Sequence, residues 1–249
     1  MLAVIMAGGE GTRLKPFTNS IPKPLLPVGD TPILEIVIKQ LKNEGFDRVI
    51  ITTGYKGDII KAYFQDGAKL GIDISYTTED KKLGTAGALS LIVNKIRKPF
   101  LVINGDILTQ LSLSSFMKFH SDNDSHLTLG LVKYKMDIPY GIVETNGQIF
   151  ENIQEKPSFF FNVGAGIYGV SPEVLEFLPH NTHMDFTELI KILNESNMRV
   201  NCYNVEDYWK DIGILKDFEE VNKDVVDWSQ NKLYHTLNDT WSTVYEKWR

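Results

Sequence analysis

Residues 2–13 read LAVIMAGGEGTR and join a short apolar run directly to a glycine-rich loop. The run Leu2–Met6 has the length and the Val/Ile content of a strand that is buried on both faces of a sheet. Three further runs of this kind follow in the first half of the chain: Arg48–Thr52, Asp73–Thr77 and Phe100–Ile103. The sequence therefore predicts four buried strands, the first of which ends at glycines.

Helix-like stretches separate these strands. The apolar residues between 33 and 41 have helical spacing, Gly45 ends the stretch, and Thr31 precedes it as the expected cap. The stretches Lys56–Phe64 and Thr85–Val93 have similar patterns. Strands and helices in strict alternation predict right-handed βαβ units, and hence a parallel sheet that is covered on both faces.

The pattern changes after Gly105, where we expect antiparallel additions to the sheet. The dipeptide Asn146-Gly147 is a hairpin-turn signal between two strand-like stretches. The expected strands of this half are Leu127–Tyr134, Gly141–Thr145, Gln148–Gln154 and Arg199–Val205, and the expected helices are Pro172–Leu178, Phe186–Asn194 and Leu215–Val226. No repeat or Gly/Ser linker interrupts them, so we expect one α/β domain over residues 1–227.

Residues 228–249 form a tail that holds three of the four tryptophans. Trp241, Tyr245 and Trp248 fall on one face of a helix at this spacing. One interpretation is a helix that packs its aromatic stripe on the domain's own surface. The alternative is a subunit interface in a homo-oligomer, where Trp and Tyr are enriched.

Composition limits the class of protein. The 249 residues are 43% hydrophobic and 23% charged, as in ordinary globular proteins. The net charge of -6 argues against a nucleic-acid partner, which usually requires a basic surplus. The single cysteine, Cys202, excludes an intramolecular disulfide, and residues 1–7 are too short an apolar run for a signal peptide. No run approaches the ~20 apolar residues that span a bilayer. We therefore expect a cytoplasmic protein without a membrane partner.

The glycine-rich loop lies where parallel α/β sheets bind ligands, at the carboxyl end of a strand. Glycines there let backbone N–H groups approach a phosphate, although tight turns alone could explain them. Leu14 replaces the third glycine of the dinucleotide fingerprint, which disfavours a nicotinamide-dependent oxidoreductase, and no Gly-Lys-Ser/Thr follows to make a P-loop. Between Gly11 and Gly29 there are three cations and no carboxylate. Prolines on both sides of Lys23 confine its backbone, and a preorganised lysine suits a polyphosphate.

These motifs resemble the signature of the sugar-1-phosphate nucleotidyltransferases. The resemblance rests first on GGEGTRLKP at residues 8–16 and PKPLLPV at residues 22–28. It continues through LGTAG at 83–87, NGD at 104–106, EKP at 155–157 and WKDIG at 209–213, and so covers about residues 1–225. The family's fold is a Rossmann-like three-layer α/β sandwich with a mostly parallel mixed sheet, which agrees with the pattern above.

The resemblance implies a reaction, NTP + sugar 1-phosphate → NDP-sugar + pyrophosphate, and roles for named residues. Arg13, Lys23 and Asp106 are the implied catalytic residues. The implied nucleotide-binding residues are Ala7, Gly8, Gly9, Gly11, Thr12, Glu79, Gly84 and Thr85. The LGTAGAL stretch at residues 83–89 looks most like the guanylyltransferase branch, as in mannose-1-phosphate guanylyltransferases, so GTP is the favoured substrate. Uridylyl-, thymidylyl- and cytidylyltransferases, and a non-catalytic regulatory homologue, are the alternatives.

Two aspartates are the implied ligands of the cofactor, Mg²⁺. Asp106 follows a buried strand, and Asp211 lies between an aromatic pair and Gly213. Each would otherwise be interpreted as an ordinary loop or turn residue. Two carboxylates suffice, because Mg²⁺ completes its coordination with phosphate oxygens and water.

The sugar-phosphate residues implied by the resemblance lie later in the chain. Lys156 would contact the sugar phosphate, Glu155 a sugar hydroxyl, and the backbone of Gly141 the sugar itself. Without the resemblance, Glu155 and Lys156 would be a solvated pair on an edge strand. Related enzymes often carry asparagine at the position of Gly164, which has no side chain to bind a hydroxyl. Asn162 is the candidate replacement.

Overall fold

The computed structural model describes residues 1–230, which form an α/β sandwich around a seven-stranded sheet in the order β12-β8-β11-β6-β1-β4-β5. The strands of this sheet are β1 (Leu2–Ala7), β4 (Arg48–Thr53), β5 (Asp73–Thr78), β6 (Phe100–Asn104), β8 (Leu127–Asp137), β11 (Ser158–Val170) and β12 (Val200–Val205). β11 pairs antiparallel with both β6 and β8, and the other neighbours are parallel. The predicted mixed sheet with antiparallel additions is therefore confirmed.

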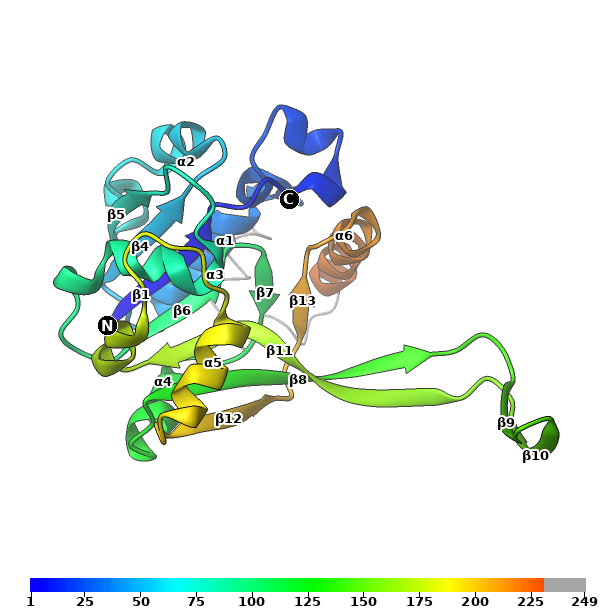
Figure 1. The fold of residues 1–249 in the computed structure, drawn as a ribbon. Coiled ribbons are helices and arrows are strands. Elements are labelled where there is room, and N and C mark those ends of the chain that lie inside the picture. The colour runs from blue at the N-terminus through cyan, green and yellow to red at the C-terminus, as the bar shows by residue number, and fades with distance from the viewer. Residues whose placement is uncertain (231–249) are drawn as a thin grey trace.

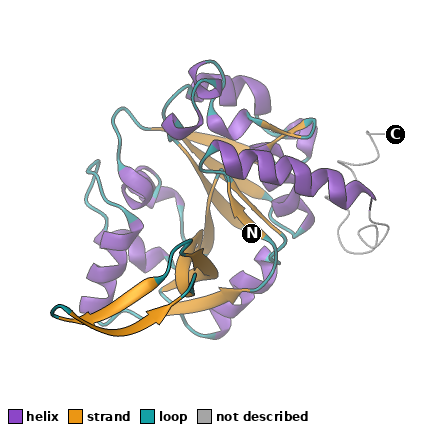
Figure 2. Cartoon of the chain, turned by 90° about the vertical axis from the view of Figure 1, so that its right-hand side faces the viewer, coloured by secondary structure: helices purple, strands orange, loops and turns teal. Residues whose placement is uncertain are grey.

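Helices lie on both sides of this sheet (Figures 1 and 2). They are α1 (Ile33–Asn43), α2 (Gly57–Phe64), α3 (Gly84–Gly87), α4 (Leu113–Asp122), α5 (Phe186–Glu195) and α6 (Leu215–Gln230). The strands alternate their side chains between two buried clusters: Ile5 packs into the cluster with α1 and α4, and Val4 into the cluster with α5. No helix among residues 1–230 has the length and the apolar character needed to span a bilayer.

Two local predictions were wrong. Thr31 does not cap α1: it pairs in a small ribbon of β2 (Pro27–Val28) with β3 (Thr31–Pro32), and its hydroxyl donates to Asp30. The expected helix Thr85–Val93 is short α3 followed by 3₁₀ turns at Ala88–Leu91 and Val93–Lys95. The backbone N–H groups of Ala86 and Gly87 both donate to the carbonyl of Met184, so a tertiary contact replaces continuous helical bonding.

Besides β2 and β3, three more strands were not anticipated: β11 and the short strands β7 (Ile107–Thr109) and β13 (Trp209–Asp211). β7 and β13 pair with each other. The expected hairpin is present as β9 (Ile142–Asn146) and β10 (Ile149–Gln154). We call residues 133–162 the arm. It consists of the outer halves of β8 and β11 with this hairpin at its end, and it projects from the body (Figure 1).

The domain boundary predicted at residues 227/228 falls within α6. Trp241, Tyr245 and Trp248 lie outside the described residues, so their helix and their oligomer contact stay predictions.

A buried histidine gives the core a pH response. His120 on α4 is 1% exposed, and its two ring nitrogens contact the hydroxyls of Thr128 at 2.8 Å and Ser171 at 3.1 Å. Burial, with a smaller contribution from His126, lowers the pKa of His120 from 6.5 to about 4. The ring is therefore neutral in the folded protein wherever the pH lies well above that value.

We expect the free energy of unfolding to fall by up to about 3 kcal/mol as the pH drops from 6.5 to about 4. The unfolded chain binds the proton near pH 6.5, whereas the folded protein resists it until about pH 4, so acid favours unfolding in this window. Urea unfolding at a series of pH values measures this slope. A His120→Gln variant should lose this component, and an unchanged slope in that variant would contradict the assignment.

Candidate active site

The glycine-rich loop leaves the carboxyl end of β1, which lies between β4 and β6 in the sheet. A Cβ on Gly8 would lie 2.6 Å from the Glu79 carboxylate, so a larger residue there would have to displace the end of that side chain. Gly11 has φ +60°, and a Cβ there would lie 3.0 Å from the Cβ of Lys23. The backbone conformation at Gly11 therefore favours glycine, and glycine at position 8 lets the loop pass close to the carboxylate of Glu79.

A cavity of about 420 Å³ opens over this loop. It gathers eight predicted residues from distant parts of the sequence: Gly8, Gly9, Gly11, Thr12, Glu79, Gly84, Thr85 and Asp106. Ala7, the last residue of β1, is buried. The cavity is also lined by Met6, Glu10, Lys82, Asn104 and His183, to which the sequence analysis gave no role. Asn104 directly precedes Gly105-Asp106, so that motif could have indicated it, whereas His183 has no local signal.

Two segments about 100 residues apart form one wall of the cavity. Gly84 has φ +74°, and a Cβ there would lie 2.6 Å from the carbonyl oxygen of Met184. The hydroxyl and the backbone N–H of Thr85 both donate to Asp185, at 3.2 and 3.0 Å. The Thr85 hydroxyl also accepts from the backbone N–H of Phe186. The hydroxyl of Thr85 thus helps to hold the wall together.

The carboxylate of Glu79 lies beside Gly8 of the glycine-rich loop. One of its carboxylate oxygens accepts the backbone N–H of Leu83 at 2.9 Å. Burial raises the pKa of Glu79, and the hydrogen bond from Leu83 opposes this rise. This carboxylate positions residues 79–83 beside Gly8.

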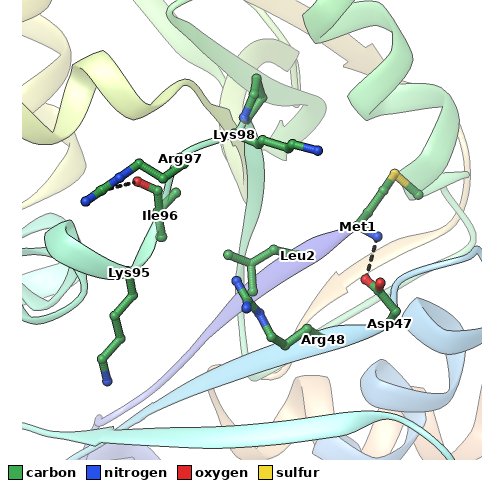
Figure 3. Close-up of a pocket in the computed structure, with 9 residues that line it drawn as sticks. Met1, Leu2, Asp47, Arg48, Lys95, Ile96, Arg97 and Lys98 are labelled. Atoms are coloured by element: carbon green, nitrogen blue, oxygen red, sulfur yellow. Dashed lines mark hydrogen bonds and ion pairs between the residues drawn. The ribbon is translucent and has the colours of Figure 1, made fainter.

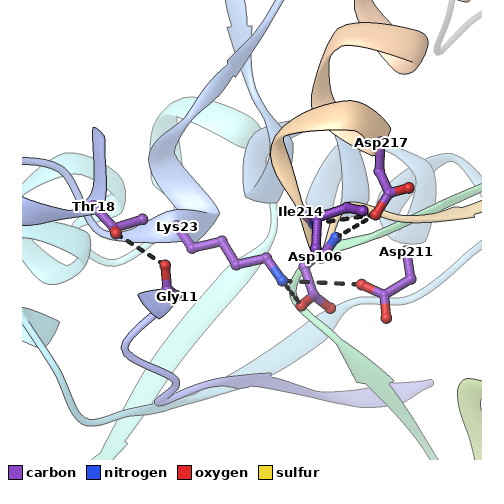
Figure 4. A network of polar contacts seen from close by, with 8 residues as sticks. Gly11, Thr18, Lys23, Asp106, Asp211, Ile214 and Asp217 are labelled. Atoms are coloured by element: carbon purple, nitrogen blue, oxygen red, sulfur yellow. Dashed lines mark hydrogen bonds and ion pairs between the residues drawn. The ribbon is translucent and has the colours of Figure 1, made fainter. Parts of the chain in front are cut away.

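An ion-pair cluster adjoins the cavity (Figure 4). Lys23, only 8% exposed, forms a close ion pair with Asp106, and its Nζ lies 3.9 Å from Oδ1 of Asp211. The β7–β13 ribbon brings the two aspartates together, because Asp211 is in register with Ile107 and the N–H of Ile212 donates to the carbonyl of Asp106. The predicted cation and the two predicted metal ligands therefore meet at one place.

The two aspartates are suited to a divalent cation. Oδ1 of Asp106 and Oδ1 of Asp211 are buried and have no hydrogen-bond partner within residues 1–230. Burial and, secondly, the charge of Asp106 raise the pKa of Asp211, whereas Lys23 and Arg13 lower it. The described residues contain no group of three or more His, Cys, Asp or Glu that could hold a metal alone. Such a pair fits Mg²⁺ that arrives with a polyphosphate, which supplies the missing ligands.

Arg13 and the turn that precedes α6 lie beside this ion-pair cluster. A Cβ on Gly213 would lie 3.3 Å from the guanidinium of Arg13, which is exposed. Asp217 accepts the backbone N–H groups of Gly213 and Ile214, at 3.3 and 3.1 Å. These bonds hold the turn after Asp211, with the Arg13 guanidinium close beside it.

The predicted sugar-phosphate residues lie elsewhere. Gly141, Glu155 and Lys156 are exposed within the outer end of the arm, which lies away from the body (Figure 1). Asn162 and Gly164 are exposed on β11, nearer its root. The structure thus brings the predicted nucleotide-binding, metal-binding and catalytic residues together, but it does not bring Glu155 and Lys156 to them.

A larger hollow of about 510 Å³ lies at the opposite edge of the sheet, at the amino ends of β1 and β4. It is lined by Met1, Leu2, Asp47, Arg48, Lys95, Ile96, Arg97, Lys98 and Pro99. The side chains of Lys95, Arg97 and Lys98 diverge (Figure 3), and the Arg97 guanidinium donates to the carbonyl of Ile96. Although it is larger, this hollow lacks the glycine loop and the paired carboxylates, so the smaller cavity is the candidate active site.

Comparison with known proteins shows the family of the chain. The family model described as nucleotidyl transferase matches residues 2–227. The chain is 32% identical over 232 residues to a mannose-1-phosphate guanylyltransferase of Mycobacterium tuberculosis, covering 90% of this chain and 64% of that protein. It is 31% identical over 247 residues to a UTP–glucose-1-phosphate uridylyltransferase of Synechocystis, covering 91% and 63%. The chain thus spans a little under two thirds of the length of these relatives.

The crystal structure of HddC from Yersinia pseudotuberculosis has the same fold. It superimposes with a TM-score of 0.71 at 29% identity, over 90% of this chain and 98% of that one. HddC complexed with GMP-PN gives a TM-score of 0.70 at 28% identity, over the same shares. Together with the family match, this confirms the resemblance that the motifs indicated.

Proposed function

Because the chain belongs to the nucleotidyl transferase family, we propose that it transfers a nucleotidyl group from a nucleoside triphosphate to a sugar 1-phosphate. One observation carries the proposal. A single cavity joins the glycine loop, Gly84–Thr85 and Asp106, and Lys23 links Asp106 to Asp211 at its edge.

The reaction is a displacement at the α-phosphorus. An oxygen of the sugar phosphate bonds to this phosphorus, the bond to the bridging oxygen breaks, and pyrophosphate leaves with that electron pair. The attacking oxygen is already an anion, so no general base is required. The protein must align the two polyanions in line. It must also offset the repulsion between them, which is about 4 kcal/mol for two unit charges ~4 Å apart at an effective dielectric constant of about 20.

We assign a separate part of this task to each of the predicted site residues. We assign Lys23 to the α-phosphate and Arg13 to the transferred and leaving phosphates. Asp106 and Asp211 would hold Mg²⁺, which when bound supplies positive charge to the polyphosphate oxygens. The backbone of Gly8, Gly9 and Gly84 would line the base pocket. Lys156 would hold the attacking phosphate, a role that requires the outer end of the arm to reach the cavity.

We propose GTP as the nucleotide. The LGTAGAL stretch, the similarity to a mannose-1-phosphate guanylyltransferase and the HddC structure with GMP-PN support it. The similarity to a uridylyltransferase at 31% identity makes UTP the second candidate. The sugar is a hexose, hexosamine or heptose 1-phosphate in this proposal.

A matrix of the four NTPs and dTTP against several sugar 1-phosphates tests both proposals, with pyrophosphate release as the readout. We expect release with GTP and at least one of these sugar phosphates, and dependence on Mg²⁺. Release with UTP, CTP or dTTP alone would overturn the choice of base. Binding of a nucleotide without release from any pair would favour a regulatory homologue over an enzyme.

A further inference from the structure

An ion pair without a role so far joins two walls of the candidate active site. The Lys82 ammonium lies 2.8 Å from Oε1 of Glu10. Glu10 belongs to the glycine-rich loop, and Lys82 belongs to the segment 79–83 that the carboxylate of Glu79 holds beside that loop. Both side chains line the cavity of about 420 Å³. The pair is therefore placed where a bound nucleotide can contact it.

This ion pair contributes little to the stability of the fold. The side chain of Lys82 is 81% exposed and that of Glu10 is 40% exposed. Water and salt compete for both charges of such a pair, so exposed ion pairs stabilise proteins only weakly. Stability therefore does not explain why the two charges meet in the cavity, and a role toward a ligand does.

The charges that line the cavity leave Glu10 dependent on Lys82. In the described part of the chain, the lining holds three carboxylates and a single lysine or arginine, which are Glu10, Glu79, Asp106 and Lys82. Asp106 pairs with Lys23, and Glu79 accepts the backbone N–H of Leu83. The hydrogen bond and the charge of Lys82 lower the pKa of Glu10, so this carboxylate is ionised at neutral pH. Without Lys82, an anion on the loop would meet a bare negative charge.

The Lys82 ammonium has donors to spare for such an anion. An ammonium carries three N–H donors, and Glu10 is the only partner of Lys82 among residues 1–230. Gly9, next to Glu10, has no atom within 4 Å of the place where a Cβ would stand, so the loop faces open space there. Successive backbone N–H groups of such loops bind phosphates. A phosphate on the loop would lie beside Glu10, within reach of the flexible lysine stem.

We propose that Lys82 binds the triphosphate of the nucleotide and that Glu10 holds its ammonium at the glycine-rich loop in advance. The inference rests on the proposed function and adds to it a residue that the sequence motifs did not indicate. The ammonium bridges the Glu10 carboxylate and a phosphate oxygen, and so offsets the repulsion between these two anions. Because every nucleoside triphosphate carries these phosphates, the contact adds affinity without selecting the base.

Calorimetric titration of the full chain with GTP and Mg²⁺ tests the proposal, with UTP in its place if only UTP binds. We expect Lys82→Met to raise the Kd about fivefold, the loss of one exposed charge-assisted contact. Lys82→Arg keeps the charge and should regain most of this affinity. Lys81→Met is the matched control, because Lys81 is the exposed neighbour that does not line the cavity, and it should bind as the wild type does. Guanosine, which has no phosphate, should bind equally to the wild type and to Lys82→Met.

The Glu10→Gln variant separates a phosphate contact from a merely structural ion pair. If the pair only holds the loop against residues 79–83, Glu10→Gln and Lys82→Met should weaken binding equally. In our proposal the two changes act in opposite directions. Glutamine still accepts a hydrogen bond from Lys82 but carries no charge to repel a phosphate, so Glu10→Gln should bind at least as tightly as the wild type. In the active enzyme, Lys82→Met should raise KM for the triphosphate and leave kcat within about twofold.

Three results would overturn the role of Lys82. They are an unchanged Kd for Lys82→Met, equal weakening by Glu10→Gln and Lys82→Met, and a loss in Lys81→Met as large as that in Lys82→Met. A wild type that binds the triphosphate but releases no pyrophosphate with any sugar phosphate would contradict the proposed activity alone, because the affinities still decide the role of Lys82. A wild type that binds no triphosphate would overturn both.

Discussion

The Asp106→Asn variant is expected to lose at least about 1000-fold in kcat for Mg²⁺-dependent pyrophosphate release, about 4 kcal/mol of transition-state stabilisation. Asparagine has nearly the same shape but carries no charge, so it binds a divalent cation far more weakly. It also removes the anion that pairs with Lys23 and one of the charges that raise the pKa of Asp211. Rates measured across a Mg²⁺ titration should show a loss that added metal does not restore.

Asp122→Asn is the matched control for this variant. Asp122 is exposed at the end of α4 and pairs with Lys118 on the same helix, a contact of little energetic value. The same chemical change there should leave the rate within about twofold of the wild type, because surface substitutions of this kind are usually within ±0.5 kcal/mol. A rate near the wild type for Asp106→Asn at saturating Mg²⁺ would contradict the role of Asp106 in metal binding.

The Lys23→Met variant is expected to lose at least about 100-fold in kcat, since it removes the only cation that contacts both aspartates in the described structure. It should also lower the free energy of unfolding at pH 7 by about 1 kcal/mol, because two partly buried carboxylates then lie close together without the cation that pairs with them. Lys23 is one of the groups that lower the pKa of Asp211, so its removal raises that pKa further.

The pH dependence of the free energy of unfolding distinguishes the loss of the ion pair in Lys23→Met from a simple loss of packing. A carboxylate whose pKa is raised in the folded state is destabilising when ionised, and this cost disappears as the pH falls and the group takes up a proton. The stability gap between Lys23→Met and the wild type should therefore narrow as the pH falls from 7 toward 4. Lys15→Met, an exposed lysine in the same loop, should change neither rate nor stability. A gap that stays constant with pH would contradict the electrostatic account.

Sequence patterns predicted the body of the fold because its strands are buried on both faces. Leu2–Met6 and Phe100–Ile103 are continuous apolar runs, and the structure extends each by only one residue. β11 was not anticipated, because its outer half is exposed on the arm while its inner half contains Gly164-Ala165-Gly166, so no single period describes it. The expected helix after Gly84 was wrong because bonds to Met184 outweigh local propensity.

The candidate site, like the fold, could be predicted from local sequence patterns only in part. The glycine loop and Lys23 could be identified from local patterns, since glycine spacing and flanking prolines act on the backbone nearby. The proximity of Asp106 and Asp211 could not be predicted from local patterns, because β7 and β13 are three-residue strands about 100 positions apart. His183 likewise reaches the cavity only through the contact of residues 183–186 with Gly84 and Thr85.

The sequence by itself determined the alternating α/β architecture, the glycine loop at the end of the first strand, and the isolated cations that follow it. These features depend on side-chain periodicity and on the backbone freedom of glycine and proline, which act over a few residues. Only the tertiary structure decided that Lys23, Asp106 and Asp211 share one cluster and that large apolar side chains of the arm are exposed among the described residues. Both depend on strand register between distant segments, because a shift of one residue would turn each side chain to the opposite face.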